Sequence, residues 1–292
     1  MKHQFNKGLL LTSLGSFWWG FIGVLYFEFV SFIGHIELVV HRCLWTAVML
    51  VLTTTFFSKW KIFFKVCKNK NTLIALFISG LLIFLNWAVW IYAVASERII
   101  DASFGYFIMP IISVLLGYIF FKEKLNTNRI FSIILVIISI IILIFFNYKS
   151  LPWVGIIVAL SWAFYNLVRK KIKIDTDIGL LIESLYILPF AVAAFYIISI
   201  NGFNDFNFNN PGLSLILILA GPMTVIPLFL YVRGVELIGL GPTGMIFYIT
   251  PTLQFILGYF YYNEEFSLIK FLSFIIIWIA VFIYLKDLYE KN

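Results

Sequence analysis

Three ionisable side chains lie inside segments that are otherwise almost entirely apolar. His41 and Arg42 lie in the apolar run that begins at Ile36, and Glu183 lies about as deep in the run that begins at Ile178. An ionisable side chain inside a bilayer costs at least ~2.5–3.5 kcal/mol, so it normally faces a cavity or a partner. The planar donors of Arg42 could hold a carboxylate or a phosphate. Glu183 could carry a proton or bind a substrate amine.

A structural role is the alternative for all three side chains. They could pair with one another or with backbone carbonyls and so fix helix packing, and long side chains near helix ends can reach the interface. His41 also belongs to a polar and aromatic face, because Glu37, His41 and Trp45 recur every four residues. When the two apolar runs are aligned from their first residues, His41 falls on Glu183.

Other polar and aromatic residues inside the apolar segments could line a central cavity. In lipid, such groups also join helices through hydrogen bonds, so both interpretations remain open for each residue. The candidates are Asn86, Trp90, Tyr106, Ser113, Tyr165, Asn166, Tyr248 and Gln254. Pro110 and Pro251 are the predicted hinge residues, because proline removes a backbone donor and can kink a helix.

The composition indicates that lipid is the solvent for most of these residues. Of 292 residues, 62% are hydrophobic and only 12% are charged, and the mean hydropathy is +1.02. Soluble domains are roughly 45–50% apolar and about 25% charged. The net charge of +7 is explained by basic loops rather than by nucleic-acid binding, since no folded domain is expected outside the apolar segments.

The apolar runs predict an all-α integral membrane protein with ten transmembrane helices. A helix needs ~20 residues to cross the hydrocarbon core. The ten runs are Gly8–Phe27, Ile36–Phe57, Thr72–Val94, Ala102–Phe121, Ile130–Phe146, Leu151–Val168, Ile178–Ile200, Leu213–Tyr231, Gly241–Tyr262 and Ile269–Leu285.

The distribution of basic residues predicts the orientation. With the N-terminus inside and ten spans, seventeen Lys and Arg residues fall on the inner side and three on the outer side. Cytoplasmic loops carry such an excess. We therefore expect a multi-pass protein of the bacterial inner membrane with both termini in the cytoplasm.

The chain also repeats itself with an offset of 141 residues. The paired positions are Pro110 and Pro251, Gly117 and Gly258, Glu123 and Glu264, Ser113 and Gln254, and Phe107 and Tyr248. This predicts two five-helix units, residues 1–148 and 149–292. Because five is odd, the units must be inverted relative to each other in the membrane. Inverted repeats around a central cavity are typical of secondary transporters.

Six motifs spread over nearly the whole chain resemble those of a known family. They are His41–Thr46, Leu85–Trp87, Ala102–Pro110, Tyr165–Lys170, Glu183–Ser184 and Tyr248–Phe255. In these the chain resembles the RarD group of EamA-type proteins, in the drug/metabolite transporter superfamily. It departs from the group at Met109, where Asn is expected, and at Phe247, where Gln is expected. The resemblance implies a ten-helix carrier of small organic molecules, commonly an exporter.

The sequence therefore predicts a secondary transporter that exports a small zwitterionic or anionic metabolite, such as an amino acid, by alternating access. The alternative is an intramembrane enzyme acting on lipid or prenyl substrates, which would need clustered acidic or histidine motifs at a membrane face; the loop acids are scattered instead. We expect no catalytic residue, cofactor or metal site, since the three histidines lack zinc-ligand spacing and no glycine-rich phosphate loop is present. Proton coupling, and a monomer or homodimer, remain open.

Overall fold

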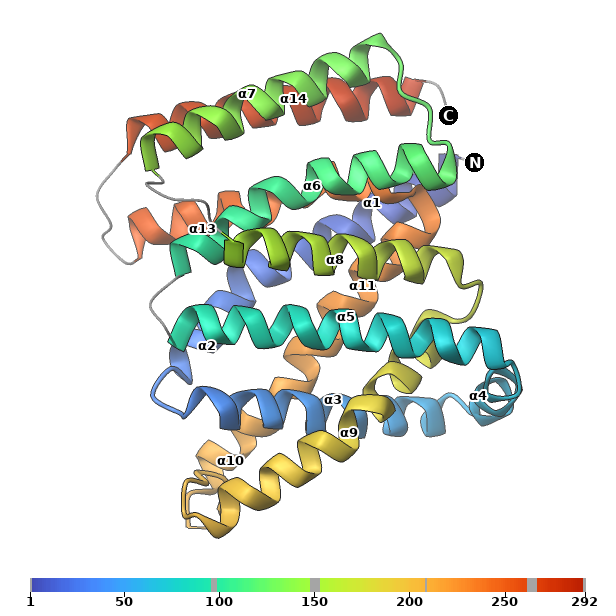
Figure 1. Cartoon of the computed structure of the whole chain (residues 1–292), viewed down its shortest axis with the longest axis vertical. Coiled ribbons are helices and arrows are strands. Elements are labelled where there is room, and N and C mark those ends of the chain that lie inside the picture. Colours follow the sequence, from blue (N-terminus) through green and yellow to red (C-terminus); the bar gives the residue numbers. More distant parts are fainter. Residues whose placement is uncertain (1, 96–98, 148–152, 208, 262–266, 291–292) are drawn as a thin grey trace.

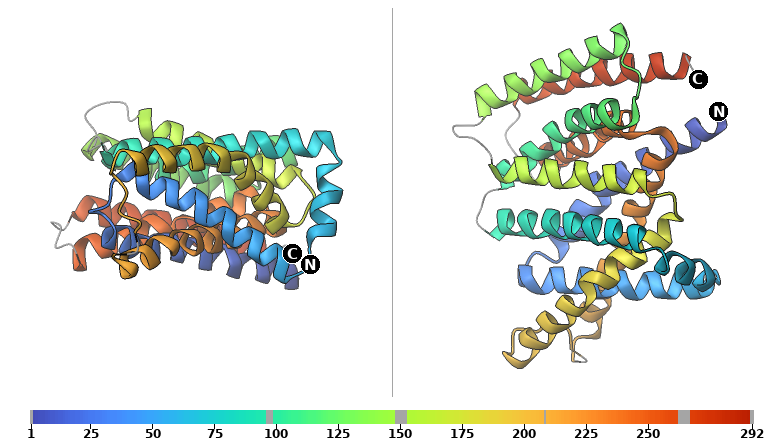
Figure 2. Two further views of the ribbon diagram at one scale, coloured as in Figure 1. Left: turned by 90° about the horizontal axis from the view of Figure 1, so that it is seen from below. Right: turned by 45° about the vertical axis from the view of Figure 1, so that its right-hand side comes forward.

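The computed structural model describes residues 2–95, 99–147, 153–207, 209–261 and 267–290. All regular elements in these ranges are helices. They lie side by side across one long axis of the molecule, with the two termini close together on the same side (Figures 1 and 2). The prediction of an all-helical fold is confirmed.

The helices follow the predicted apolar runs, with several breaks. Their bounds are α1 Lys2–Phe17, η1 Trp18–Ile22, α2 Gly23–Phe29, α3 His35–Phe56, α4 Trp60–Cys67, α5 Lys70–Ala95, α6 Ile99–Phe121, α7 Thr127–Asn147, α8 Trp153–Lys171, α9 Thr176–Ile200, α10 Pro211–Ile218, α11 Ala220–Ile238, α12 Leu240–Ile246, α13 Ile249–Phe260 and α14 Leu268–Glu290. The first run is divided into α1, η1 and α2, and the eighth and ninth runs each form two helices.

Seven helical stretches of the described residues are long and apolar enough to cross a membrane. They are His3–Phe29, His35–Phe56, Lys70–Trp90, Thr127–Phe146, Thr176–Ile200, Pro211–Ile238 and Leu268–Glu290. The chain is therefore a multi-pass membrane protein. Three predicted spans, in α6, α8 and α12–α13, do not reach that threshold. A span count of ten stays a prediction.

Two helices at the top of Figure 1, α7 and α14, run antiparallel. The Arg129 Nε, near the start of α7, lies 2.9 Å from the Asp287 carboxylate, near the end of α14. Further along, the Ser139 hydroxyl donates to the Ser273 carbonyl at 2.9 Å. The start of each helix therefore lies beside the end of the other.

The pair α3 and α9 is antiparallel as well. The ring of His41, early in α3, is 5.6 Å from the ring of Phe195, late in α9. Lys59, which follows α3, donates to Asp177 in the first turn of α9 at 2.7 Å. These contacts hold both ends of the pair in register.

A third antiparallel pair is formed by α6 and the helices α12 and α13. The hydroxyl of Tyr248 donates to the carbonyl of Phe107 at 2.8 Å. After α6, the carboxylate of Glu123 accepts from the backbone N–H groups of Leu240 and Gly241, each at 2.9 Å. Because the first N–H groups of a helix have no internal partner, this carboxylate caps the start of α12.

A π-helix interrupts the first membrane-crossing stretch. η1 spans Trp18–Ile22, between α1 and α2, and π-helical turns are frequent at functional sites. Gly20 brings it against α13, since a Cβ there would lie 2.9 Å from the carbonyl oxygen of Thr250. Trp19 packs against Trp162 and Tyr231 in the aromatic centre of the bundle.

Candidate functional site

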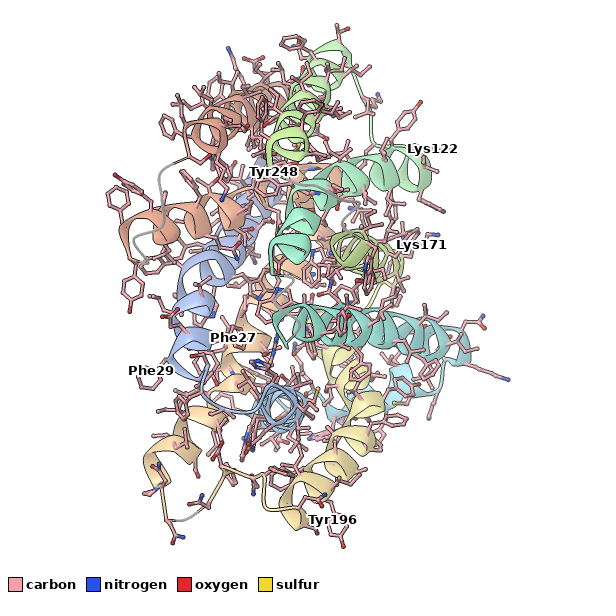
Figure 3. The ribbon with its side chains drawn as sticks, turned by 60° about the vertical axis from the view of Figure 1, so that its left-hand side comes forward. Phe27, Phe29, Lys122, Lys171, Tyr196 and Tyr248 are labelled. Carbon is pink, nitrogen blue, oxygen red and sulfur yellow. The ribbon has the colours of Figure 1, made fainter. Side chains whose placement is uncertain are left out.

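Arg42 lies in an aromatic box between α2, α3, α5 and α11. Its guanidinium carbon is 5.0 Å from the ring centre of Phe27 and 4.8 Å from that of Trp87. Its Nε donates to the Thr224 hydroxyl at 3.2 Å. Figure 3 shows Phe29 on the outer side of α2, away from the bundle, and it is 64% exposed. Phe27, two residues earlier, points inward and contacts the arginine.

No carboxylate forms an ion pair with Arg42 in the part of the chain that the structure describes. The side chain is only 9% exposed. The ring faces attract its charge, but they do not use the guanidinium's paired donors as a carboxylate would. The arrangement therefore leaves a buried positive charge free to bind an anion.

Glu183 pairs with an arginine that the sequence analysis did not select. Its Oε1 is 3.4 Å from Nη1 of Arg169, which lies near the end of α8. The same carboxylate accepts from the hydroxyl of Ser79, on α5, at 2.5 Å, and from that of Tyr165, on α8, at 3.2 Å. Glu183 therefore joins α5, α8 and α9 through one buried side chain.

Arg169 also faces a second carboxylate. Its Nη2 donates to the Thr176 carbonyl at 3.0 Å and lies 3.9 Å from Oε1 of Glu236, on α11. Glu236 in turn accepts from the hydroxyl of Thr176 and from Arg233, both at 2.7 Å. We call Arg169, Glu183, Glu236, Arg233 and Thr176 the Arg169 network.

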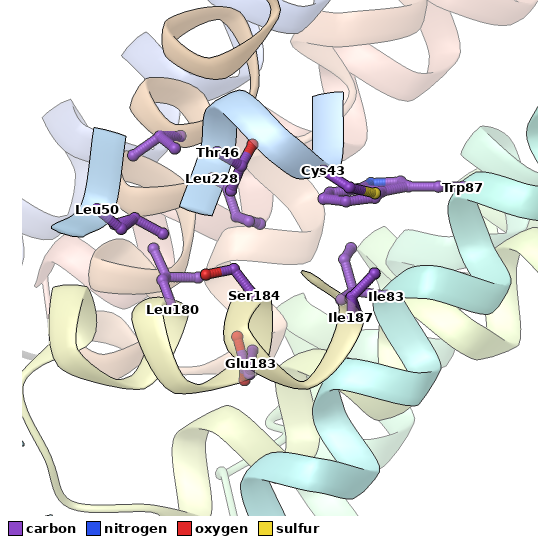
Figure 4. Close-up of a pocket in the computed structure, with 11 residues that line it drawn as sticks. Cys43, Thr46, Leu50, Ile83, Trp87, Leu180, Glu183, Ser184, Ile187 and Leu228 are labelled. Atoms are coloured by element: carbon purple, nitrogen blue, oxygen red, sulfur yellow. The ribbon is translucent and has the colours of Figure 1, made fainter. Parts of the chain in front are cut away.

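A small cavity adjoins both clusters (Figure 4). It offers about 20 Å³ to the centre of a water molecule, which is room for roughly one water. Glu183 and Ser184 of α9 line it together with Cys43 of α3. Trp87, which stacks on Arg42, forms another part of its wall. The cavity thus lies between the unpaired arginine and the paired glutamate.

The structure does not bring His41 and Glu183 together. His41 lies 3.4 Å from the Glu37 carboxylate and accepts at Nδ1 from the Trp45 indole at 3.2 Å. Its contact on α9 is Phe195, twelve residues beyond Glu183 and so ~18 Å along the helix. The His41 contacts follow the predicted i, i+4 face, with Glu37 and Trp45 on either side of the ring.

Several candidates make helix-to-helix hydrogen bonds. Asn86 of α5 donates to the Val158 carbonyl of α8 at 2.9 Å and to the Ser161 hydroxyl at 3.1 Å. The indole of Trp90 is hydrogen-bonded to the hydroxyl of Tyr106, close to the Arg42 box. Such bonds are the ones expected of residues that fix helix packing.

The remaining candidates are spread along the bundle. Asn166 donates to the Trp162 carbonyl of its own helix at 2.9 Å, and its amide oxygen has no partner among the described residues. Ser113 donates to the sulfur of Met109 at 3.3 Å. Gln254 is partly buried on α13. Ser113 of α6 packs against Gly244 of α12, ten residues before Gln254, with which the repeat pairs it.

The two predicted hinge residues occupy different helix positions. Pro110 lies inside α6, where its missing N–H leaves the carbonyl of Tyr106 without an i→i−4 donor. Pro251 is the third residue of α13, where the first N–H groups have no helical partner in any case. Of these two prolines, only Pro110 therefore weakens the interior of its helix.

Seven membrane-crossing helical stretches around a buried cavity that Glu183 lines define a multi-pass membrane protein. No cluster of metal-ligating side chains is found in the described ranges. The EamA-like transporter family model matches residues 6–145 and 150–286, and the chain belongs to this family. It is a family of transporters rather than enzymes, which decides against the alternative of an intramembrane enzyme.

Curated relatives match over nearly the full length. Uncharacterized transporter YojE of Bacillus subtilis is 32% identical, with 97% of this chain and 95% of that protein covered. Protein RarD of Escherichia coli is also 32% identical, with the same coverage of 97% and 95%. A solved structure with 12% sequence identity covers 96% of this chain and 97% of its own, with a TM-score of 0.72, which supports the fold.

Proposed function

We propose that this chain is a secondary transporter that exports a small organic anion or zwitterion, such as an amino acid, by alternating access. Arg42 carries the proposal, because it is buried among aromatic rings and has no carboxylate partner among the described residues. A buried charge without a partner is costly. A substrate carboxylate that binds it would supply the missing hydrogen bonds. Trp87 and Phe27 would pack against the substrate as they pack against the guanidinium.

We further propose ten transmembrane helices in two inverted units, residues 1–148 and 149–292. Three pairs of helices at corresponding positions in the two units, α3 with α9, α6 with α12–α13 and α7 with α14, are antiparallel. Phe107 and Tyr248, which are 141 residues apart, contact each other. A residue meets its own equivalent only near a two-fold axis. A two-fold axis that makes equivalent helices antiparallel lies across them, in the membrane plane, which supports an inverted repeat.

The remaining site residues take supporting roles in this proposal. Asn86, Trp90 and Tyr106 hold the helices around Arg42 through their hydrogen bonds, Glu183 couples transport to protons, and Pro110 lets α6 bend. Both termini face the cytoplasm of a bacterial cell, which places the Arg169 network at the inner end of the bundle. The excess of basic residues on that side supports this orientation.

The test is substrate counterflow with purified protein in liposomes. A panel of amino acids and small organic acids is offered to vesicles that hold the same unlabelled solute. Accumulation of label without an energy source identifies a carried solute. Absence of counterflow for every carboxylate in the panel, with neutral or cationic solutes carried instead, would overturn the anion site.

Arg42→Lys then tests the anchor. Lysine keeps the charge but loses the planar pair of donors. We expect the dissociation constant for the carried anion to rise about ten- to a hundredfold, as for one lost charged hydrogen bond of ~1.5–3 kcal/mol. Arg129→Lys is the matched control, because Arg129 is buried against Asp287 away from the cavity. It should lower thermal stability and leave affinity unchanged.

A further inference from the structure

Among the charged residues that the structure describes outside the proposed substrate site, Arg169 is the most enclosed. Its side chain is 1% exposed, and its contacts come from the start of α9 and the end of α11. Glu183 and Glu236 thus share one guanidinium across three helices. The short connection between α8 and α9 holds their ends together, and the contact between Arg169 and Glu183 holds α9 against α8 about two turns beyond it.

The chain leaves room for this side chain. A Cβ at Gly179, one turn before Glu183 on α9, would lie 1.8 Å from Nη1 of Arg169. On the other side of Glu183, Gly80 of α5 lets its backbone approach, since a Cβ there would meet the Glu183 carbonyl at 3.4 Å. Two glycines therefore allow the close approach of three helices around one ion pair.

The hydrogen bonding of the network is incomplete. Nε of Arg169 and Oε1 of Glu236 are buried and make no hydrogen bond within the described residues. Buried polar groups are nearly always paired. Nη2 of Arg169 lies only 3.9 Å from that same Glu236 oxygen. If the guanidinium moves slightly away from Glu183, it can therefore donate a hydrogen bond to Oε1 of Glu236.

Glu183 is also the member of the network that borders the cavity. It lines the cavity with Ser184 and Cys43 (Figure 4), whereas Arg169 and Glu236 are not among the residues that form its wall. A proton that enters the cavity can thus reach Glu183 without crossing the ion pair.

We propose that Arg169 is the positioning residue of an inner gate, which opens when Glu183 is neutralised from the cavity. A proton delivered by water in the cavity binds a carboxylate oxygen of Glu183. Arg169 then keeps Glu236 and the Thr176 carbonyl, the charge attraction that holds α9 against α8 at Glu183 is lost, and the cavity opens at the inner end. The inference rests on the proposed transport function and adds to it the identity of the gate.

The groups that face Glu183 are consistent with this role. Ser79 faces it from α5, and Tyr165 and Arg169 face it from α8. Across the cavity α3 contributes Cys43 and Thr46, and α11 contributes only Val225 and Leu228 there. Arg169 is therefore the one fully charged group in direct contact with Glu183 among the described residues.

Cys43 supplies a natural reporter of gate opening. It is buried and unbonded, and it lines the same cavity. In a Cys67→Ser background, a membrane-impermeant maleimide is added outside inverted vesicles, where it meets the cytoplasmic face of the protein. We expect Glu183→Gln and Arg169→Lys each to label about tenfold faster than the parent, as expected when a minor open state becomes the main one.

Glu236→Gln is the matched control, since it removes the other carboxylate of the same arginine. Arg169 should then stay on Glu183, and labelling of Cys43 should be no faster than in the parent. If Glu183→Gln and Glu236→Gln increase the labelling rate of Cys43 equally, the network only stabilises helix packing, and the proposal is overturned. Slow labelling of both Glu183→Gln and Arg169→Lys would do the same.

A pH series separates gating from thiol chemistry. Acid slows maleimide labelling because the thiolate is the reactive form, so the rate in the parent is divided by the rate in Glu183→Gln. This ratio should start low at high pH and rise towards one as pH falls and Glu183 takes up its proton. A ratio independent of pH would contradict opening by protonation.

A second variant and a separate transport assay distinguish failure of the gate from failure of folding or of the substrate site. If Glu183→Gln does not fold, Arg169→Lys, which keeps the charge, gives the same labelling test. Substrate counterflow reports separately on the proposed function: faster labelling of Cys43 with no effect of Arg42→Lys on substrate affinity removes the anion site and leaves the gate. The opposite result removes the gate and leaves the site.

Discussion

Three buried arginines of this protein have three different surroundings. Arg129 meets one carboxylate, Asp287, at 2.9 Å. Arg169 lies between two carboxylates, while Arg42 meets two aromatic rings and a hydroxyl. A buried pair tends to be structural, and a buried charge without one is best explained by a ligand. The groups around each arginine, rather than the residue type, therefore distinguish Arg42 from the two arginines that pair with carboxylates.

Asn86 allows a direct test of whether a buried polar residue holds helices or substrate. Its amide donates to the backbone and a side chain of α8. Interhelical hydrogen bonds in membranes average about 0.6 kcal/mol and reach about 1.7. Asn86→Leu should lower thermal stability in detergent by an amount in this range and leave substrate affinity within twofold of the parent. Lost affinity at unchanged stability would make Asn86 a ligand.

The sequence could select Arg42 and Glu183, because a charge inside an apolar run is visible without a structure. It could not select Arg169. This residue begins the run Arg169–Lys173, which has the composition of an ordinary cytoplasmic loop. Only the return of α9 and α11 to the end of α8 shows that Arg169 is buried while Lys171 is exposed. Burial of a loop-like residue depends on tertiary contacts that no local pattern contains.

At the scale of helices, apolar runs bounded by charges predicted most of the long elements. They did not predict α4, which lies in the lysine-rich stretch after α3, because its eight residues are too few to cross a membrane. Val66 of α4 packs against Leu76 and Ile178. The π-helix η1 was missed as well, since it depends on the contact of Gly20 with α13. Helix interruptions that depend on tertiary packing therefore cannot be predicted from the local amino-acid composition.

The contact between α3 and α11 depends on one glycine. A Cβ at Gly221 would lie 2.5 Å from the carbonyl oxygen of Trp45, a backbone atom that cannot turn aside. Gly221→Ala should therefore destabilise the protein by about 1–3 kcal/mol, as overpacking of a tight interface does. Gly212→Ala is the control, because the nearest atom to its added Cβ, Oδ1 of Asn210, would be 3.9 Å away. Equal melting temperatures of the two variants would contradict the close approach.

At the scale of the whole molecule, the ends of the helices define two sides. Figure 1 shows both termini and α4 on one side, and the connection from α9 to α10 on the other. The Arg169 network lies at the ends of α8 and α11 and the start of α9. Lys59, at the end of α3, joins Asp177 at the start of α9 on that same side. The termini, α4 and the gate should therefore share one compartment.

Reporter fusions test which compartment that is. The seventeen basic residues expected on the inner side, against three outside, predict that it is the cytoplasm. Reporters at Asn292 and in the segment Lys59–Lys70 should be active only in the cytoplasm, and a reporter near Asp205 only outside. An even number of spans is required for both termini to share a side, so a C-terminal reporter active only outside would refute the ten-span arrangement and the inverted repeat together. It would also move the Arg169 gate to the outer end, since the gate lies with the C-terminus.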